Sequence, residues 1–550
     1  MYKFSLSMYF PTPRFAKEAL PLAKRKNYYS SIKTMKRLPY HLLSLIPGAA
    51  LLTSCSQSAN KISKSVTHPQ RPNVIYLISD DLGIGDLSCY GATKISTPNI
   101  DRLAGQGLQF TNAYATSSTS TPSRFGLLTG MYPWRQENTG IAPGNSELLI
   151  DTACVTMADM FKAEGYATGA IGKWHLGLGP KGGTDYNSQI RPNTQDIGFD
   201  YEFIIPATVD RVPCVFVENG RVAGLDPNDP ITVNYEHKVG DWPTGKENPE
   251  LVKMKPSMGH DNTIINGIPR IGWMTGGKAA LWNDEDIADN ITDKAKNFIK
   301  AHKDEPFFLY MGTQDIHVPR VAHPRFAGKS NLGPRGDVIL QLDWTVGEIM
   351  HTLDSLNLAD NTIIVFCSDN GPVIDDGYQD QAHEMLNGHQ PMRHYRGGKY
   401  SSFEAGTRIP FIVRWPSQIK PGKQQSAFSM IDVYASLSTL LGHKLPQGAA
   451  PDSRDRLDVF LGQTPDEEAF VVQQNLHNTL SIIKDEWKYI EPSNRPALEY
   501  WTKIEMGNNP QPQLYNLASD PSEQKNVASS HPEIVQELSS LLKEIKEKKR

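Results

Sequence analysis

The chain has 550 residues, of which 39% are hydrophobic and 21% are charged. This length and composition are ordinary for a globular protein with a large core, and they predict two domains. The formal net charge of −4 provides no basic footprint for nucleic acid, so we expect no nucleic-acid partner. Any anion that the protein binds must therefore be attracted by a local cluster of cationic side chains.

The chain contains five cysteines, namely Cys55, Cys89, Cys154, Cys214 and Cys367. Their spacing matches neither a paired zinc site nor a dense disulfide framework. We therefore predict that the last four are core residues, whereas Cys55 lies in a different sequence context.

The N-terminal segment has the features of an export signal. A basic pair at residues 36–37 precedes the apolar run 42–54, which is too short for a permanent transmembrane helix. The run ends in Leu-Thr-Ser before Cys55 and resembles a bacterial lipobox, in which the cysteine is lipidated and becomes the mature N-terminus. We expect a leader over residues 1–55, a lipid anchor at Cys55 and a polar tether over residues 56–70. The alternative is an ordinary cleaved signal.

Met35 opens an ordinary signal peptide, so we expect translation to start there rather than at Met1. The residues after Cys55 lack an acidic run. By resemblance to Gram-negative lipoproteins, this favours the periplasmic side of the outer membrane over surface display. The expected location is therefore the periplasm, with the protein anchored to the outer membrane.

Three apolar runs predict buried parallel strands, at residues 73–79, 307–311 and 362–368. Helical patterns lie among them, at residues 98–106, 155–164 and 338–356. This alternation predicts an α/β fold with a mostly parallel central sheet flanked by helices. Ligands of such folds bind beyond the carboxyl ends of the strands.

The sequence pattern changes after about residue 430. Short apolar runs predict antiparallel strands at residues 470–472, 480–483 and 487–490. Residues 532–545 carry apolar side chains on one helical face, and we expect this helix to pack on the small sheet. We therefore predict a main domain over 71–430 and a smaller α+β domain over 431–550.

Acidic or amide side chains follow two of the predicted strands. Asp80 and Asp81 follow the first, and Asp369 and Asn370 follow the last. Each pair alone is also typical of a turn or a helix cap. Because hard oxygen donors suit calcium or magnesium, two pairs at equivalent strand ends predict one divalent-cation site.

Four further segments supply a hydroxyl, cations and histidines. Residues 120–124 read STPSR and are followed by FGLLTG. Lys173 and His175 are two residues apart, so on an extended segment both side chains would face the same anion. His317 follows a predicted strand, and Lys399 follows a Gly-Gly pair. Each segment alone would be an ordinary loop.

Together, these motifs resemble the type I sulfatase family in order and spacing over residues 70–430, with a further similar stretch at 514–523. In that family the first residue of the motif, here Ser120, is oxidised to formylglycine, an aldehyde that hydrates to a gem-diol. A serine at this position implies an oxygen-independent radical maturase as a partner. The resemblance is to the serine-type bacterial carbohydrate sulfatases, and it implies an alkaline-phosphatase-like α/β domain with a smaller C-terminal domain.

The resemblance implies hydrolysis of a sulfate monoester by a formylglycine gem-diol with a single calcium ion. Its implied calcium ligands are Asp80, Asp81, Ser120 as formylglycine, Asp369 and Asn370.

The same resemblance assigns roles to five further side chains. Arg124 and Lys173 would steady the hydrated aldehyde and the sulfate. His175 would be the base that collapses the covalent intermediate. His317 and Lys399 would contact the sulfate and assist departure of the alcohol.

Physical chemistry supports this division of roles. A sulfate monoester is an ionised anion, so a divalent cation and cationic side chains must offset the repulsion of an oxygen nucleophile. A serine hydroxyl would form a stable sulfate ester, whereas a gem-diol expels sulfate as the aldehyde re-forms. His175 needs a pKa near the operating pH for that step.

The expected substrate is a sulfated carbohydrate, and the resemblance favours galactose or N-acetylgalactosamine. Residues 205–280 are rich in Gly, Pro and Asn and have the pattern of an insertion near the site. The expected sugar contacts are Asp210, Arg211, Arg393 and His394, each with a solvated loop residue as the alternative. Two other functions stay open: a phosphatase or phosphodiesterase of the same superfamily, and a non-enzymatic glycan-binding lipoprotein.

Overall fold

The computed structural model of the protein describes residues 71–464 and 469–548, all within one compact unit. The predicted leader over residues 1–55, the anchor at Cys55 and the tether over residues 56–70 lie outside the described residues. Within the described part of the chain, no helix is both long and apolar enough to cross a membrane.

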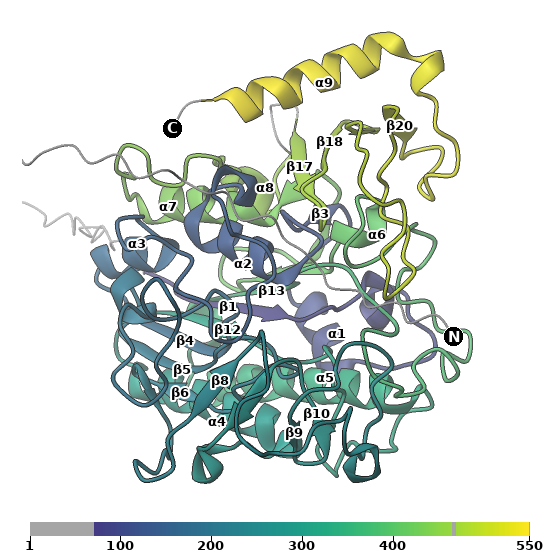
Figure 1. Cartoon of the computed structure of the whole chain (residues 1–550). Coiled ribbons are helices and arrows are strands. Elements are labelled where there is room, and N and C mark those ends of the chain that lie inside the picture. The colour runs from purple at the N-terminus through teal and green to yellow at the C-terminus, as the bar shows by residue number, and fades with distance from the viewer. Residues whose placement is uncertain (1–70, 465–468, 549–550) are drawn as a thin grey trace, which may run out of the picture. The chain divides into compact units, whose positions relative to one another are not determined.

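The large sheet is built around five parallel strands (Figure 1). In spatial order these are β13 (Thr362–Ser368), β1 (Asn73–Ser79), β12 (Phe307–Gly312), β4 (Ala167–Lys173) and β5 (Tyr201–Ile205). Every residue of β1, β12 and β13 is buried, which explains why these strands have continuous apolar sequences rather than alternating ones. The three predicted parallel strands are confirmed.

Shorter strands complete this sheet to ten. On the β13 side these are β14 (Phe411–Arg414), β2 (Leu108–Phe110) and β15 (Gly422–Gln424), and on the β5 side β6 (Val217–Glu218) and β7 (Arg221–Val222). The pairs β13–β14, β14–β2, β5–β6 and β6–β7 are antiparallel. The sheet is therefore mixed but mostly parallel, as predicted.

Helices cover both faces of the sheet (Figure 1). On one side lie α4 (Ile287–Ala301), α5 (Gly333–Ser355) and α1 (Pro98–Gly105), and on the other lie α2 (Ser120–Thr129), α3 (Met157–Ala163) and α7 (Val433–Leu441). The helices predicted at 98–106, 155–164 and 338–356 are present with shifted ends. The α5 helix begins earlier than predicted because Pro334 suits its first turn.

Small two-stranded ladders lie outside the main sheet. They are β3 (Ala113–Tyr114) with β16 (Phe428–Ser429), β8 (Thr232–Asn234) with β11 (Trp273–Thr275), and β9 (Ile264–Ile265) with β10 (Ile268–Pro269). The last two ladders belong to the segment 205–280. That segment therefore has little regular structure, as its composition indicates.

A second, antiparallel sheet is formed by the C-terminal part of the chain. Its strands, in order, are β17 (Phe470–Gln474), β18 (Leu480–Lys484), β19 (Trp487–Ile490) and β20 (Gln513–Asn516). The amphipathic helix α9 (Pro532–Glu547) packs on this sheet through Leu538 and Leu542, which confirms its predicted position. The domain boundary after residue 430 stays a prediction.

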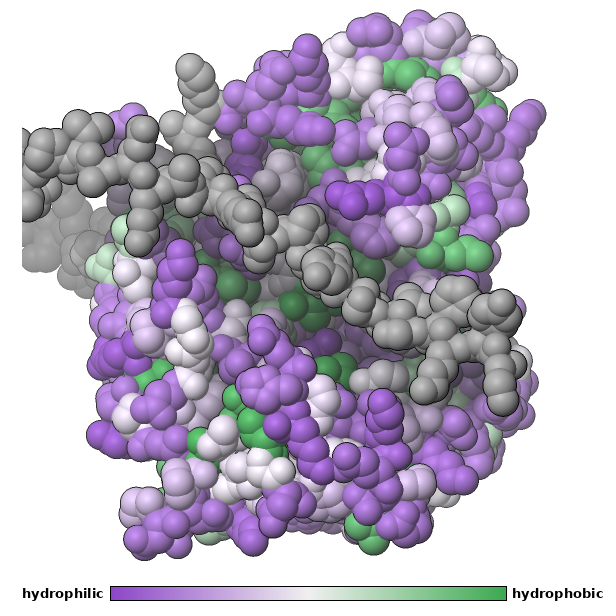
Figure 2. All heavy atoms as spheres, viewed as in Figure 1, coloured by the Kyte–Doolittle hydropathy of each residue, from purple (hydrophilic) through white to green (hydrophobic). Residues whose placement is uncertain are grey.

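The surface is mostly hydrophilic on the face seen in Figure 2, with hydrophobic residues in small separate groups. Over the described residues, the exposed large hydrophobic side chains are Leu251, Leu498, Tyr500 and Trp501. Of the cysteines expected in the core, Cys214 and Cys367 are buried, whereas Cys89 and Cys154 are only half-buried.

Candidate active site

The carboxyl ends of β1 and β13 bring together the four predicted metal ligands, Asp80, Asp81, Asp369 and Asn370. Each of these residues is at most 1% exposed. They meet because the two strands pair in parallel with Ser79 opposite Ser368, so both chains leave the sheet at the same edge. Asn370 Nδ2 donates to Asp81 Oδ1 at 2.8 Å, and the Asp81 backbone N–H donates to Asp369 Oδ1 at 3.3 Å.

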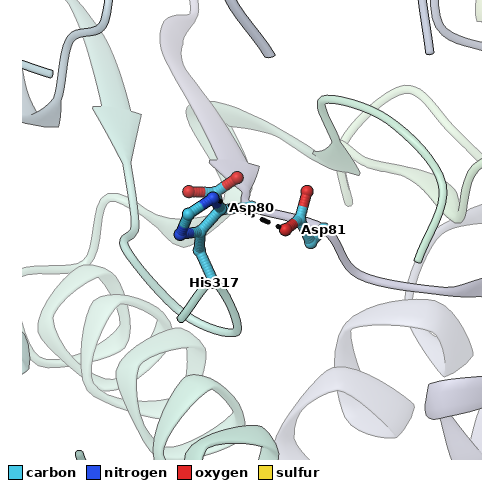
Figure 3. Close-up of side chains that lie close together, drawn as sticks. All are labelled: Asp80, Asp81 and His317. Atoms are coloured by element: carbon cyan, nitrogen blue, oxygen red, sulfur yellow. Dashed lines mark ion pairs between the residues drawn. The ribbon is translucent and has the colours of Figure 1, made fainter. Parts of the chain in front are cut away.

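His317 approaches the same carboxylates from the loop after β12 (Figure 3). Its Nε2 lies 3.7 Å from Asp81 Oδ2, and its Nδ1 lies 2.6 Å from the carbonyl oxygen of Val318. Because a carbonyl only accepts, the Nδ1 atom carries a proton. Asp80, Asp81 and His317 are close enough to hold one metal ion. The sequence predicted oxygen ligands alone, so the proximity of His317 is an additional finding.

The backbone of Asp81 is strained. Its φ of 60° lies in the left-handed region, which residues other than glycine seldom occupy. Such a conformation costs about 1–3 kcal/mol and persists only where the surroundings enforce it. His175 and Tyr400, with φ of 59° and 79°, share this conformation at the same site.

Ser120 is the first residue of α2 and lies directly against the acidic cluster. Its Oγ is 3.3 Å from both Asp80 Oδ1 and Asn370 Oδ1, and it accepts a hydrogen bond from Lys173 Nζ at 2.8 Å. Ser120 lies at the N-terminus of α2, where the helix dipole favours negative charge. The position therefore combines a hydroxyl, a cation and a helix N-terminus.

Two buried cations, Arg124 and Lys173, offset part of the negative charge of the acidic cluster. Arg124, one helical turn after Ser120, donates from Nε and Nη2 to Asp369 Oδ2 at 3.0 and 2.8 Å. Lys173 Nζ lies 2.6 Å from Asp80 Oδ2 and 3.4 Å from Asp369 Oδ2. Burial opposes ionisation of Asp369, but Lys173 and Arg124 outweigh it and hold the pKa of that carboxyl well below its usual range.

His175 lines the cavity, but not for the reason that the sequence suggested. The β4 strand ends at Lys173 and His175 adopts a left-handed φ, so these side chains do not follow the two-residue repeat of an extended segment. His175 Nε2 lies 3.1 Å from the Ala142 carbonyl oxygen and therefore carries the proton. The buried Nδ1 has no hydrogen-bond partner among the described residues and holds the free lone pair.

The charge of His175 follows from its surroundings. Burial, together with the positive charges of Lys173, Arg211 and Arg124, holds the pKa of His175 well below its usual value. The ring is therefore neutral at neutral pH. The sequence argument expected a base with a pKa near the operating pH, and burial with the neighbouring cations lowers the pKa of His175 from the usual histidine value.

Lys399 forms an ion-pair network with Asp81 and Asp376. The sequence analysis predicted Lys399 and Asp81 as site residues but not Asp376. Its Nζ lies 2.8 Å from Asp81 Oδ2 and 2.7 Å from Asp376 Oδ2. Tyr400 Oη donates to Asp376 Oδ1 at 2.8 Å. Burial opposes the charge on Lys399, but Asp376 and Asp81 raise its pKa well above the usual value. Asp376 lies in an irregular segment without a motif, which is why it was not predicted.

A cavity of about 360 Å³ opens above Ser120. Its other lining residues include His175, His317, Lys399, Tyr400, Asp210, Arg211, His260, Asp376, Glu499, Trp501 and Thr502. Arg124 and the four predicted metal ligands lie behind this surface. Histidines, cations and carboxylates thus surround one space that is large enough for a small anionic ligand.

The expected sugar contacts divide into two groups. Asp210 and Arg211 line the cavity, and Asp210 bridges Arg211 Nη1 at 2.9 Å and His260 Nε2 at 3.0 Å. Arg393 and His394 are exposed and are not part of the cavity lining. Arg393 instead donates to the Tyr90 carbonyl oxygen, and the His394 ring packs against Tyr395.

Sequence reasoning also missed His260 and the C-terminal contribution to the cavity. Glu499, Trp501 and Thr502 reach it from the segment between β19 and β20. The signal available in the sequence was the adjacent aromatic pair at residues 500–501 within a polar stretch.

The residues present fit a hard divalent cation. Three carboxylates and one amide oxygen converge without cysteine, which suits calcium. Asp80 Oδ2 is buried and accepts no well-aligned hydrogen bond from the described residues, although Lys173 Nζ lies 2.6 Å away. Within the described part of the chain, the other group close enough to hold an ion is Asp286, Asp289 and His323, which is outside the cavity lining.

These features define an α/β fold in which histidines, cations and carboxylates line one cavity beside a buried acidic cluster. The sequence profile of the Sulfatase family matches residues 72–443. The chain belongs to the sulfatase family and is a sulfuric ester hydrolase. The predicted family and reaction class are therefore confirmed.

Relatives support this assignment over most of the chain. The N-acetylgalactosamine-6-O-sulfatase of Bacteroides thetaiotaomicron is 75% identical over 505 residues, which cover 92% of this chain and 98% of that protein. Human arylsulfatase A is 30% identical over 500 residues, 86% of this chain and 87% of that protein. A solved structure concerned with the metabolism of multiple glycosaminoglycans by Bacteroides thetaiotaomicron has a TM-score of 0.87 and 76% identity, over 87% of this chain and 100% of that chain.

Proposed function

We propose that the protein removes 6-O-sulfate from N-acetylgalactosamine residues of glycans, using formylglycine at Ser120 and a single calcium ion. The observation that carries this proposal is the 75% identity to an N-acetylgalactosamine-6-O-sulfatase over 92% of the chain. The cavity above Ser120 is consistent with it, since cations lie at the base and hydrogen-bonding side chains lie along the wall.

The calcium ion would be held by Asp80, Asp81, Ser120 as formylglycine, Asp369 and Asn370. When bound, it would draw charge from the sulfuryl oxygens. The chain supports this assignment with three buried carboxylates, whose charge Lys173 and Arg124 offset only in part.

Arg124 and Lys173 would stabilise the anion with their positive charges. Lys173 Nζ is 2.8 Å from Ser120 Oγ, so its charge lies beside the reacting position. Arg124 is clamped to Asp369 by two hydrogen bonds, which keep its guanidinium in place without a conformational change. Such preorganised charges stabilise a developing anion more effectively than water does.

His175 and His317 serve opposite proton transfers in this proposal. His175 is neutral with a free Nδ1 lone pair, which suits a base that takes a proton from the modified residue 120. His317 has its Nδ1 proton committed to the Val318 carbonyl oxygen, so a proton for the departing alcohol would come from Nε2 of the doubly protonated ring. Lys399 assists there with its positive charge.

Asp210 and Arg211 would bind the hydroxyl groups of the sugar ring. Asp210 is 2% exposed, and its carboxylate is oriented by Arg211 and His260. A carboxylate held in this way accepts hydrogen bonds from ring hydroxyls with little loss of entropy. Arg393 and His394 form no part of the proposed sugar site.

The proposal has two partners beyond the glycan. Ser120 would require a radical maturase, because the chain is synthesised with serine at this position and formylglycine must be formed from it after translation. Cys55 would carry the lipid that anchors the protein to the periplasmic face of the outer membrane, and mass spectrometry of the mature N-terminus tests this. A Cys55→Ala variant recovered in the membrane fraction would contradict the anchor.

The experiment is a desulfation panel of N-acetylgalactosamine-6-sulfate, galactose-6-sulfate, N-acetylgalactosamine-4-sulfate and N-acetylglucosamine-6-sulfate, with released sulfate measured by ion chromatography. We expect release from the first at the highest kcat/KM and none in a Ser120→Ala variant. Mass spectrometry of the active-site peptide should give a mass lower than serine by two hydrogens. Preferred release from the 4-sulfate, or full activity with unmodified Ser120, would contradict the proposal.

A further inference from the structure

Exposed hydrophobic side chains gather in one loop of the protein. In the described residues, four large hydrophobic side chains are exposed, and Leu498, Tyr500 and Trp501 are three of them. Trp501 also lines the active-site cavity. It is 50% exposed whereas Ser120 is 3% exposed, so Trp501 lies at the mouth and Ser120 at the base. Exposed apolar surface beside a binding site is typical of a ligand contact.

The loop holds Trp501 in a fixed place. Glu499 Oε2 accepts hydrogen bonds from the Thr502 N–H at 2.6 Å and the Thr502 hydroxyl at 3.0 Å, which closes the turn that carries Trp501. Trp501 also packs edge-on against Tyr500, with ring centroids 4.9 Å apart and an interplanar angle of 79°. An aromatic ring oriented before binding loses little entropy when a ligand stacks on it.

The loop is also tied to the segment that carries Lys399. Arg396 Nε lies 2.7 Å from Glu505 Oε2, and the Ser402 N–H donates to the Met506 carbonyl oxygen at 2.9 Å. These contacts lie on either side of Lys399 in the chain. These contacts therefore fix the loop that carries Trp501 relative to Lys399, which also lines the cavity.

The cavity is small for a glycan. Its volume of about 360 Å³ lies at the low end of the range of ligand pockets, which is about 300–1,000 Å³. One sulfated ring with its substituents fills such a space. A sugar linked to that ring must leave through the mouth, where Trp501 supplies an apolar ring against which the C–H groups of a pyranose can pack.

We propose that Trp501 forms a stacking subsite for the sugar that is linked to the sulfated residue, so that the enzyme binds the end of a glycan chain more tightly than a free sulfated monosaccharide. This inference rests on the proposed function. It assigns to the C-terminal part of the chain a role in substrate length selection.

The test compares the wild type and a Trp501→Ala variant on N-acetylgalactosamine-6-sulfate and on a disaccharide with that residue at its non-reducing end. For the disaccharide we expect KM to rise about tenfold with kcat unchanged, as for loss of one well-packed aromatic contact. For the monosaccharide we expect a much smaller fall in kcat/KM than for the disaccharide. Trp501→Phe should restore most of the loss.

The matched control is Leu498→Ala, which removes a side chain of the same loop that is 52% exposed and lies outside the cavity lining. It should leave both substrates unaffected. Equal effects of Trp501→Ala on the two substrates, or none on either, would overturn the subsite while leaving the proposed function intact. A wild type that releases no sulfate from either sugar would refute the proposed function, and the subsite with it.

Discussion

Lys488 Nζ lies 3.0 Å from Glu404 Oε1, and both side chains are fully buried. Lys488 belongs to β19 of the small sheet, whereas Glu404 begins the short helix α6 (Glu404–Thr407), five residues after Lys399. Lys488 also lies 3.1 Å from Glu523 Oε1, and Glu523 Oε2 accepts the Glu404 N–H at 2.6 Å. A buried ionic network therefore joins the C-terminal sheet to the segment that forms the base of the cavity.

Removing the shared cation of this network should destabilise the protein strongly. We expect Lys488→Met to lower the free energy of unfolding by about 3–5 kcal/mol, because two buried carboxylates lose their common partner. Denaturant unfolding monitored by circular dichroism measures this. Lys546→Met is the control, since its pair with Glu491 is 44% exposed on the lysine side and should contribute at most about 1 kcal/mol. Equal losses in both variants would contradict the prediction.

The activity should persist at acidic pH. Burial and neighbouring cations lower the pKa of His175, so its base form remains present as the pH falls below the usual histidine range. The acid limb of kcat/KM against pH should therefore lie below about pH 6.5. Arg211→Gln removes one of the positive charges that lower this pKa, so the limb should move to higher pH. A limb that stays in place in this variant would contradict the assignment of His175 as the base.

Calcium should stabilise the folded protein independently of activity. The clustered carboxylates repel one another, and an ion bound only by the native state adds about 2.7 kcal/mol at about 100 times its Kd. We expect EGTA to lower the Tm and added calcium to restore it. Asp369→Asn should abolish this calcium response, whereas Asp289→Asn, in the outlying acidic group, should retain it. The opposite pattern would place the ion at the second group.

The maturation of Ser120 should be separable from folding. Protein made in a host without the radical maturase should show the same circular dichroism and, in EGTA, the same Tm as the mature enzyme, because Ser120 and its neighbours are already packed together. Its activity should fall by more than about a thousandfold through loss of the nucleophile. A Ser120→Cys variant made together with the maturase should recover activity. An enzyme that is fully active without the maturase would refute the formylglycine proposal.

The central strands and the acidic cluster were predictable because they depend on simple rules. β1 and β13 are buried on both faces, which gives continuous apolar runs, and parallel pairing forces Asp80 and Asp369 to one edge. The positions of side chains in irregular segments were harder to predict from the sequence. The reasoning for Lys173 and His175 assumed an extended segment that ends at Lys173, and Arg393 turns towards Tyr90 despite its closeness to Lys399 in sequence.

The approach of Asp376 and Trp501 to the cavity could not be predicted from the spacing of residues in the sequence. Asp376 and Trp501 belong to irregular segments whose approach to the cavity depends on tertiary contacts, such as the pair between Arg396 and Glu505. Such contacts leave no periodic pattern in the sequence.

The left-handed backbone at Asp81, His175 and Tyr400 has a consequence for how this enzyme evolves. At each position glycine or asparagine would relieve the local strain, so selection for heat resistance alone favours replacing side chains that belong to the proposed active site. Thermal robustness and turnover are therefore opposed at these three positions. An engineering campaign should hold them fixed and look for stability elsewhere in the protein.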